Sequence, residues 1–210
     1  GYFSYEIIRH IEKKLQNSSK EKLPYPDISL MVSDEVVIYD NLKKSLFIVV
    51  HGTEDTKKEC HERIELIHKK ILEPLPSQKS SKKGVINFES SVKKEDYLEA
   101  IKKIKNYIVE GDVMQVVYGQ EFSTKFEGSP IDLYRSLRKL NPSPYMYLIK
   151  IDDLHIVGAS PEILVRLQNE EVTVRPIAGT VKRGKDNKED KELADKLKSD
   201  PKEIAEHLML

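Results

Sequence analysis

The spacing of apolar residues predicts helices and a hairpin in the first third of the chain. Apolar side chains recur at helical spacing near the start, at Ile7, Ile8, Ile11 and Leu15. This spacing predicts a first helix that ends near the polar residues 17–20. Two β-branched runs, 35–39 and 46–50, predict a hairpin, and helical spacing returns over residues 55–72.

A polar stretch over residues 73–84 divides the pattern. It is rich in proline, serine and lysine and has almost no apolar content. Such a composition is typical of a linker. The sequence therefore predicts an N-terminal accessory portion over residues 1–72, a linker over 73–84, and the first part of a second domain over 85–210.

The second region mixes both kinds of spacing. A short strand is predicted at 85–88, followed by a helix that ends at Gly111, because glycine adopts the left-handed conformation at little cost. The strand formers in 112–122 predict a long strand, and Pro130 begins a helix that runs to Leu140.

Further elements complete the pattern towards the end of the chain. Strand-like runs occupy 145–150, 155–157, 163–167 and 172–175, and helices are predicted over 188–197 and from Pro201 onward. Ser199 or Asp200 can cap the last helix. Meandering strands with intervening helices predict an α+β fold with a mixed, largely antiparallel sheet and packed helices.

Composition narrows the class of partners. Lys and Arg number 35, as do Asp and Glu, so the formal net charge is zero, which provides no field that attracts nucleic acid or anionic membranes. No apolar run approaches the length of a bilayer span, and the first residues lack the pattern of a signal peptide. We expect a cytoplasmic protein without nucleic-acid or membrane partners, and assign no role to its single cysteine, Cys60.

Three sets of residues could carry chemistry. Glu162 follows a strand-like run, where a held carboxylic acid can act as a general acid. Glu203 and Glu206 are one turn apart on a helix face and could hold Mg²⁺ through oxygen. Gly179 and Thr180 offer a backbone amide and a hydroxyl to a carboxylate. A loop glutamate, a solvated acidic pair and an ordinary turn are the alternative interpretations, which local chemistry alone favours for the acidic residues.

Four segments that follow one another along the chain favour the functional interpretation of these residues. They read NPSPYM at 141–146, GASPE at 158–162, RPIAGT at 175–180 and DPKEIAEH at 200–207. The residues in these segments and the order of the segments resemble those of the anthranilate synthase component I family, within the chorismate-utilising enzymes. The resemblance covers nearly the whole chain and is strongest after Gly111. The chain ends in a helical pattern without a stop signal, so we expect a fragment lacking both ends.

The resemblance implies a role for each candidate. Glu162 would protonate the departing C4 hydroxyl of chorismate, and Gly179 and Thr180 would contact a substrate carboxylate. Glu206, with Glu203 one turn before it, would form half of a Mg²⁺ site. The other half and a catalytic histidine are expected beyond residue 210, so the chain alone should be inactive.

Two positions bear on the reaction. Gln115 occupies the place of a water-activating lysine in isochorismate and salicylate synthases, and an amide is not a useful base. Ala178 replaces a lysine nucleophile of many aminodeoxychorismate synthases and forms no adduct. The resemblance thus implies that ammonia attacks C2 of chorismate and that pyruvate is eliminated, giving anthranilate in the tryptophan branch. Aminodeoxychorismate synthase component I and a non-catalytic binding fragment remain the alternatives.

The resemblance also implies partners and regulation. Ammonia would come from a glutamine amidotransferase subunit, component II. Pro144, Tyr145 and Met146 would contact tryptophan as a feedback inhibitor, although a rigid turn entering a strand explains them equally well on local chemistry. The sequence departs from the family at 180–184, which reads TVKRG instead of TRPRG, and at Glu121, where arginine is common.

Overall fold

The computed structural model describes residues 1–16, 24–75 and 87–210. The chain forms two compact units, one of residues 1–80 with 149–154 and one of residues 81–148 with 155–210. The predicted linker lies mostly outside the described residues. The division at residues 72 and 84 therefore stays a prediction.

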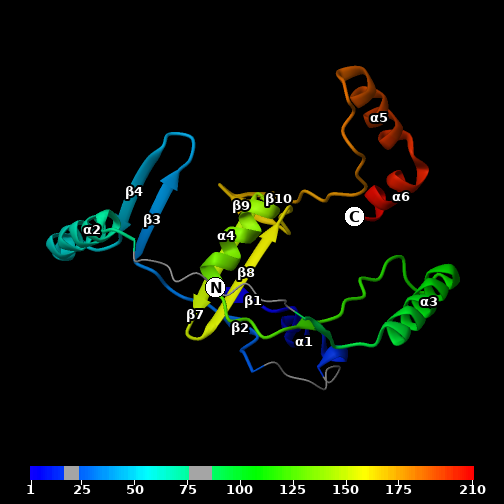
Figure 1. Ribbon diagram of the computed structural model, residues 1–210, viewed down its shortest axis with the longest axis horizontal. Coiled ribbons are helices and arrows are strands. Elements are labelled where there is room, and N and C mark those ends of the chain that lie inside the picture. Colours follow the sequence, from blue (N-terminus) through cyan, green and yellow to red (C-terminus); the bar gives the residue numbers. More distant parts are fainter. Residues whose placement is uncertain (17–23, 76–86) are drawn as a thin grey trace. The chain divides into compact units, whose positions relative to one another are not determined.

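The first unit contains a hairpin with a helix packed against one of its strands (Figure 1). Its strands and helix are β1 (Tyr2–Phe3), β2 (Ile28–Ser29), β3 (Glu35–Asp40), β4 (Ser45–Val50) and α2 (Lys57–Leu72). Both β1 with β2 and β3 with β4 pair antiparallel, and α2 packs against β4. Arg63 on α2 donates to Glu35 on β3, with a distance of 3.0 Å from Nη2 to Oε2. The predicted hairpin and the helix after it are confirmed.

The predicted first helix is present only in pieces. Its parts are the 3₁₀ turn η1 (Tyr5–Ile7), α1 (Ile8–Ile11) and the 3₁₀ turn η2 (Lys13–Leu15). Glu12 interrupts the helix with an extended backbone at φ −99° and ψ 103°. A short helix without a side-chain cap has little stability of its own, which explains the break.

The second unit mixes helices with short strand pairs. Its helices are α3 (Lys94–Glu110), α4 (Pro130–Leu140), α5 (Asn187–Ser199) and α6 (Pro201–Met209). Its strands are β5 (Glu89–Ser90), β6 (Phe122–Ser123), β9 (Arg166–Gln168), β10 (Glu171–Thr173) and most of β7 (Tyr145–Ile151) and β8 (Leu154–Ser160). The linked ends of β7 and β8, within residues 149–154, belong to the first unit. Neighbouring strands pair as β5 with β6, β7 with β8 and β9 with β10. The α+β class is confirmed.

The helix boundaries follow the sequence signals closely. Gly111 ends α3 with φ 83°, in the left-handed region that glycine adopts readily. Pro130 stands at the first turn of α4, where its missing N–H costs nothing. Asp200 caps α6 by accepting from the N–H groups of Lys202 and Glu203 at 2.9 and 3.5 Å.

The predicted long strand over 112–122 is wrong. Only its last residue belongs to a strand, because none of residues 112–121 pairs with a neighbouring strand in the described chain. Strand formers specify a strand only where a partner completes the ladder. The segment is held instead by Tyr118, whose ring packs 5.0 Å from that of Tyr97 and whose carbonyl accepts from the Tyr97 hydroxyl at 3.0 Å.

Two further strand predictions shift along the chain. Residues 85 and 86 of the predicted strand 85–88 lie outside the described residues, and β5 begins at Glu89. The predicted strand 163–167 narrows to β9, which begins at Arg166. Residues 163–165 precede it as loop, and Ile163 and Leu164 line the recess beside Glu162.

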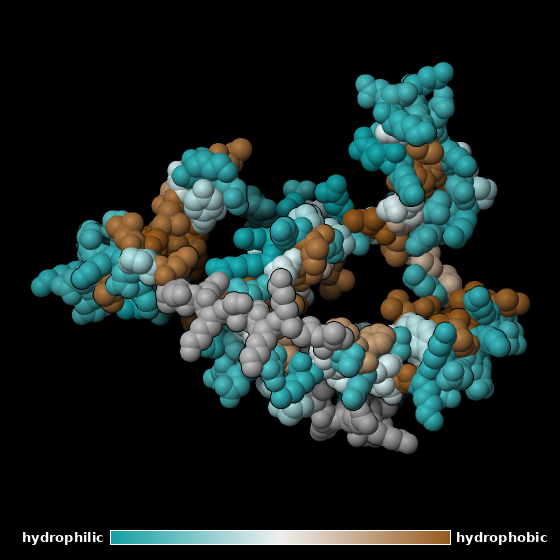
Figure 2. Space-filling view, viewed as in Figure 1, coloured by the Kyte–Doolittle hydropathy of each residue, from teal (hydrophilic) through white to brown (hydrophobic). Residues whose placement is uncertain are grey.

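Apolar side chains gather on particular faces. Figure 2 shows brown residues where α2 meets the β3–β4 hairpin and along one side of α3. Among the described residues, no apolar side chain is fully buried. No helix in the described part of the chain is long and apolar enough to cross a membrane.

Candidate active site

Glu162 is held just after the end of β8. The Ser160 hydroxyl donates to the backbone carbonyl of Glu162 at 2.9 Å, which closes a tight turn. The half-buried side chain of Glu162 then accepts the backbone N–H of Ile177 at 2.7 Å through Oε1. The carboxylate therefore contacts the segment 175–180, which the sequence had singled out separately.

An open recess lies beside this carboxylate. Its volume is about 420 Å³, and it is lined by Ser160, Glu162, Ile163, Leu164, Val174, Pro176 and Leu210. Ligand pockets typically enclose a few hundred Å³ of mostly apolar wall with a few polar groups. The recess is more open than such a pocket, and its wall is mainly apolar, with Glu162 as the ionisable side chain.

Glu203 approaches the same segment from α6. Its carboxylate lies against Gly179 so closely that a Cβ at position 179 would overlap it. Its Oε2 atom is buried and has no hydrogen-bond partner among the described residues. A buried carboxylate oxygen without a partner is costly, and a cation would offset that cost.

The donor chemistry at this point fits a hard cation. Mg²⁺ binds oxygen and commonly takes one or two protein carboxylates. Glu203 and Glu206 are both half-buried on α6, and Glu203 is the one at Gly179. Within the described residues, no group of three or more His, Cys, Asp or Glu side chains could hold a metal. These residues thus offer part of a ligand set.

Two acidic side chains therefore meet one short segment. Glu162 contacts it at the amide of Ile177, and Glu203 contacts it at Gly179. Two residues of chain span at most about 7 Å, so the two contacts lie within the length of a small ring compound. Thr180 follows directly and is exposed. The structure brings together the candidates for acid, carboxylate cradle and metal ligand.

The other candidates lie on different elements. Gln115 is exposed in the irregular segment after α3. Pro144 precedes β7, and Tyr145 and Met146 are its first two residues. Ala178 lies half-buried between the two acidic contacts.

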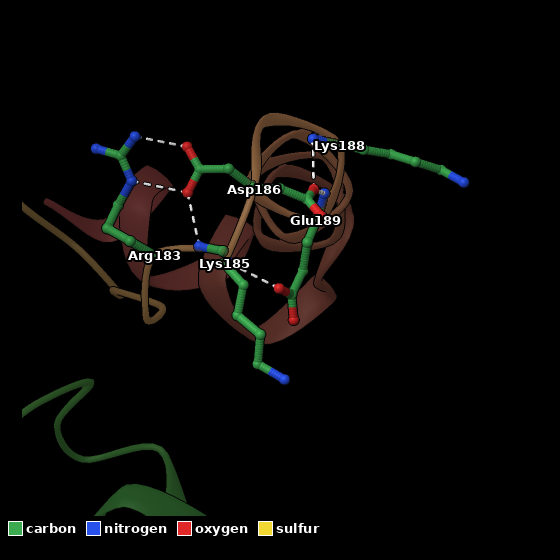
Figure 3. Close-up of polar contacts among 7 residues, drawn as sticks. Arg183, Lys185, Asp186, Lys188 and Glu189 are labelled. Carbon is green, nitrogen blue, oxygen red and sulfur yellow. Dashed lines mark hydrogen bonds and ion pairs between the residues drawn. The ribbon is translucent and has the colours of Figure 1, made fainter.

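One polar cluster was missed by the sequence patterns. Arg183 donates from Nε and Nη2 to the Asp190 carboxylate at 2.7 and 2.6 Å, and the N–H of Gly184 donates to the same carboxylate at 2.8 Å (Figure 3). The side-chain hydrogen bonds from Arg183, followed by the Gly184 amide, lower the pKa of Asp190. Asp186 begins α5 by accepting from the N–H groups of residues 188 and 189. An Asp directly before a helical pattern is the signal that could have located this cluster.

Comparison with known proteins identifies the family to which the chain belongs. The family described as chorismate binding enzyme matches residues 1–210, and the chain belongs to this family. Anthranilate synthase component 1 of Pseudomonas putida is 45% identical over the whole chain, which covers 44% of that protein. The Aquifex aeolicus protein of the same name is 41% identical, again with 44% of its length covered.

A solved structure agrees with these relatives. The crystal structure of anthranilate synthase component I from Streptococcus pneumoniae TIGR4 matches with a TM-score of 0.86 and 30% identity. The match covers 100% of this chain and 47% of that one. The chain thus spans less than half the length of the relatives it matches. The family resemblance and the fold predicted from the sequence are confirmed.

Proposed function

We propose that the protein containing this chain aminates chorismate at C2 and eliminates pyruvate to give anthranilate, in a Mg²⁺-dependent reaction. The observation that carries the proposal is the meeting of Glu162 and Glu203 on the segment 177–179. The names of the similar proteins support the same reaction.

Each residue then has a defined task. The amide of Gly179 and the hydroxyl of Thr180 orient a carboxylate of chorismate. Glu203 and Glu206 hold Mg²⁺, which when bound supplies positive charge for the substrate carboxylate and for charge that develops in the transition state.

Glu162 serves as the acid during amination. As ammonia forms the bond to C2, the ring double bonds shift and the C4–O bond breaks. Glu162 gives its proton to the departing oxygen, which leaves as water. Loss of the enolpyruvyl group as pyruvate and of a ring proton then yields the aromatic product, with a base from outside this chain.

Ammonia is favoured over water and over a covalent route by two side chains. Gln115 is an amide and cannot accept a proton from water near neutral pH. Ala178, which lies between the two acidic contacts, has no nucleophilic atom. Aminodeoxychorismate synthase component I is the second candidate; it also aminates chorismate, but at C4 and without eliminating pyruvate.

Partners and regulation belong to the same proposal. A glutamine amidotransferase subunit supplies ammonia, in keeping with relatives that are named as one component of an enzyme. Pro144, Tyr145 and Met146 bind tryptophan, and the exposure of Tyr145, which is 43% accessible, supports this role. The cytoplasmic location stays a prediction.

Product analysis tests the proposal. The full-length protein is incubated with chorismate, ammonium and Mg²⁺, and the products are separated by chromatography. We expect anthranilate and pyruvate in equal amounts, with neither formed when ammonium or Mg²⁺ is omitted. Accumulation of aminodeoxychorismate or isochorismate in place of anthranilate would contradict the proposal.

A further inference from the structure

The chain between Gly179 and α5 is anchored at its far end by the Arg183–Asp190 cluster. A Cβ on Gly184 would lie 2.6 Å from the Cα of Asp190, so the two backbones touch and only glycine fits. The N–H of Lys185 donates to the Glu189 carboxylate at 2.7 Å. Residues 183–185 are therefore fixed to the first turn of α5.

The other end of the same connection is fixed to α6. Gly179 lies against the Glu203 carboxylate, and α6 packs on α5 and begins at the Asp200 cap. The chain from Gly179 to Arg183 thus runs between two points of one helix pair. Four residues span at most about 14 Å, so the two anchored points are joined by a short connection, through which we expect a shift at Asp190 to reach Gly179.

The energetics favour orientation over stability as the role of this cluster. The Arg183 side chain is 88% exposed, and that of Asp190 is 29% exposed. Exposed ion pairs add little to folding stability because water screens them. Two parallel hydrogen bonds from one guanidinium nevertheless fix direction well.

We infer that Asp190, with Arg183 and Gly184, is a positioning group that sets how Gly179 meets the Glu203 carboxylate, and thereby tunes the Mg²⁺ affinity of that site. The inference rests on the proposed function. It predicts that Asp190 affects the Mg²⁺ requirement more than the maximal rate.

Two variants test this in the full-length protein. D190N keeps the size of the side chain and an oxygen for Gly184, but it turns an NH₂ group towards the donors of Arg183. R183K keeps the positive charge but loses the two parallel hydrogen bonds that a guanidinium group can donate. D132N is the matched control, because it removes another exposed Asp–Arg pair of the same unit, Asp132 with Arg135 at 3.2 Å on α4.

The readouts are the Mg²⁺ concentration for half-maximal rate, the kcat at saturating Mg²⁺, and the Mg²⁺ concentration at the midpoint of the metal-induced rise in Tm. For D190N we expect both Mg²⁺ concentrations to rise severalfold, less than the roughly 10- to 100-fold seen for direct hydrogen-bond partners of metal ligands, because Asp190 bonds Arg183 and Gly184 instead. The kcat of D190N should stay within about twofold of wild type. Both Mg²⁺ concentrations should also rise in R183K, and all three readouts of D132N should match wild type.

The outcomes separate the two claims. A wild-type protein that forms no Mg²⁺-dependent anthranilate overturns the proposed function and the inference that rests on it. Wild-type activity with D190N within twofold in both Mg²⁺ measurements, or with D132N shifted equally, overturns the positioning role alone. If D190N loses its far-UV circular dichroism, the result for R183K decides by the same criteria.

Discussion

Replacing Glu162 by glutamine separates its chemical role from its structural one. The glutamine oxygen can still accept the N–H of Ile177, which lies 2.7 Å from Oε1 in the wild type. A hydrogen bond to a charged acceptor contributes about 1 kcal/mol more than one to a neutral acceptor. This difference corresponds to about fivefold in rate or binding.

Loss of a general acid has a much larger effect. Positioned proton donors contribute about 10²- to 10⁴-fold to rate, so a loss of about two orders of magnitude or more exceeds what altered positioning explains. For full-length E162Q we expect kcat to fall by such a factor, while the KM for chorismate stays within about fivefold of wild type. E162A should lose the contact with Ile177 as well and raise KM further.

Anthranilate fluorescence under saturating ammonium and Mg²⁺ gives both parameters. E171Q serves as the control, because Glu171 is an exposed glutamate at the start of β10 in the same unit. It should behave as wild type. Turnover by E162Q within about fivefold of wild type would refute the assignment of Glu162 as the acid.

Three further predictions concern the nucleophile, the metal and pH. Full-length Q115K should lose amination and gain trace isochorismate, because a partly desolvated amine can accept a proton from water; unchanged ammonia-dependent anthranilate formation would show that Gln115 does not select the nucleophile. E203Q and E206Q should each need more Mg²⁺ for half-maximal rate. The larger shift is expected for E203Q, because the buried Oε2 of Glu203 lacks a partner among the described residues. Mg²⁺ titrations of both variants that superimpose on wild type would remove the metal assignment. The pKa of Asp190 is lowered by Arg183, so its stabilising contribution is complete above about pH 4 and is lost as pH falls through the lowered pKa. Protection of the Gly184 amide, measured as its exchange rate relative to the intrinsic rate at the same pH, should therefore be high at neutral pH and fall in acid, whereas in D190N this protection should change little with pH.

Local signals predicted the elements whose causes are local. Gly111 and Pro130 mark helix ends through their own backbone preferences, and the Asp200 cap acts on residues two and three positions away. The 112–122 segment failed because a strand depends on a partner that its own residues do not specify.

The candidate site was predicted as residues but not as an arrangement. No periodicity links Glu162 to the amide of Ile177, or Glu203 to Gly179, because both contacts depend on how distant elements fold back. The resemblance to a family selected these residues, and the structure adds that they share one segment. Arg183 was noted only as a departure from the family pattern, and its bond to Asp190 needed coordinates.

A crystal structure of the full-length E162Q protein with chorismate and Mg²⁺ tests the shared site most directly, since the variant should bind substrate without consuming it. We predict the C4 hydroxyl of chorismate within hydrogen-bond distance of residue 162, a substrate carboxylate at Gly179 and Thr180, and Mg²⁺ coordinated by Glu203. Chorismate bound away from the segment 177–180, or Mg²⁺ bound without Glu203, would contradict the proposed site.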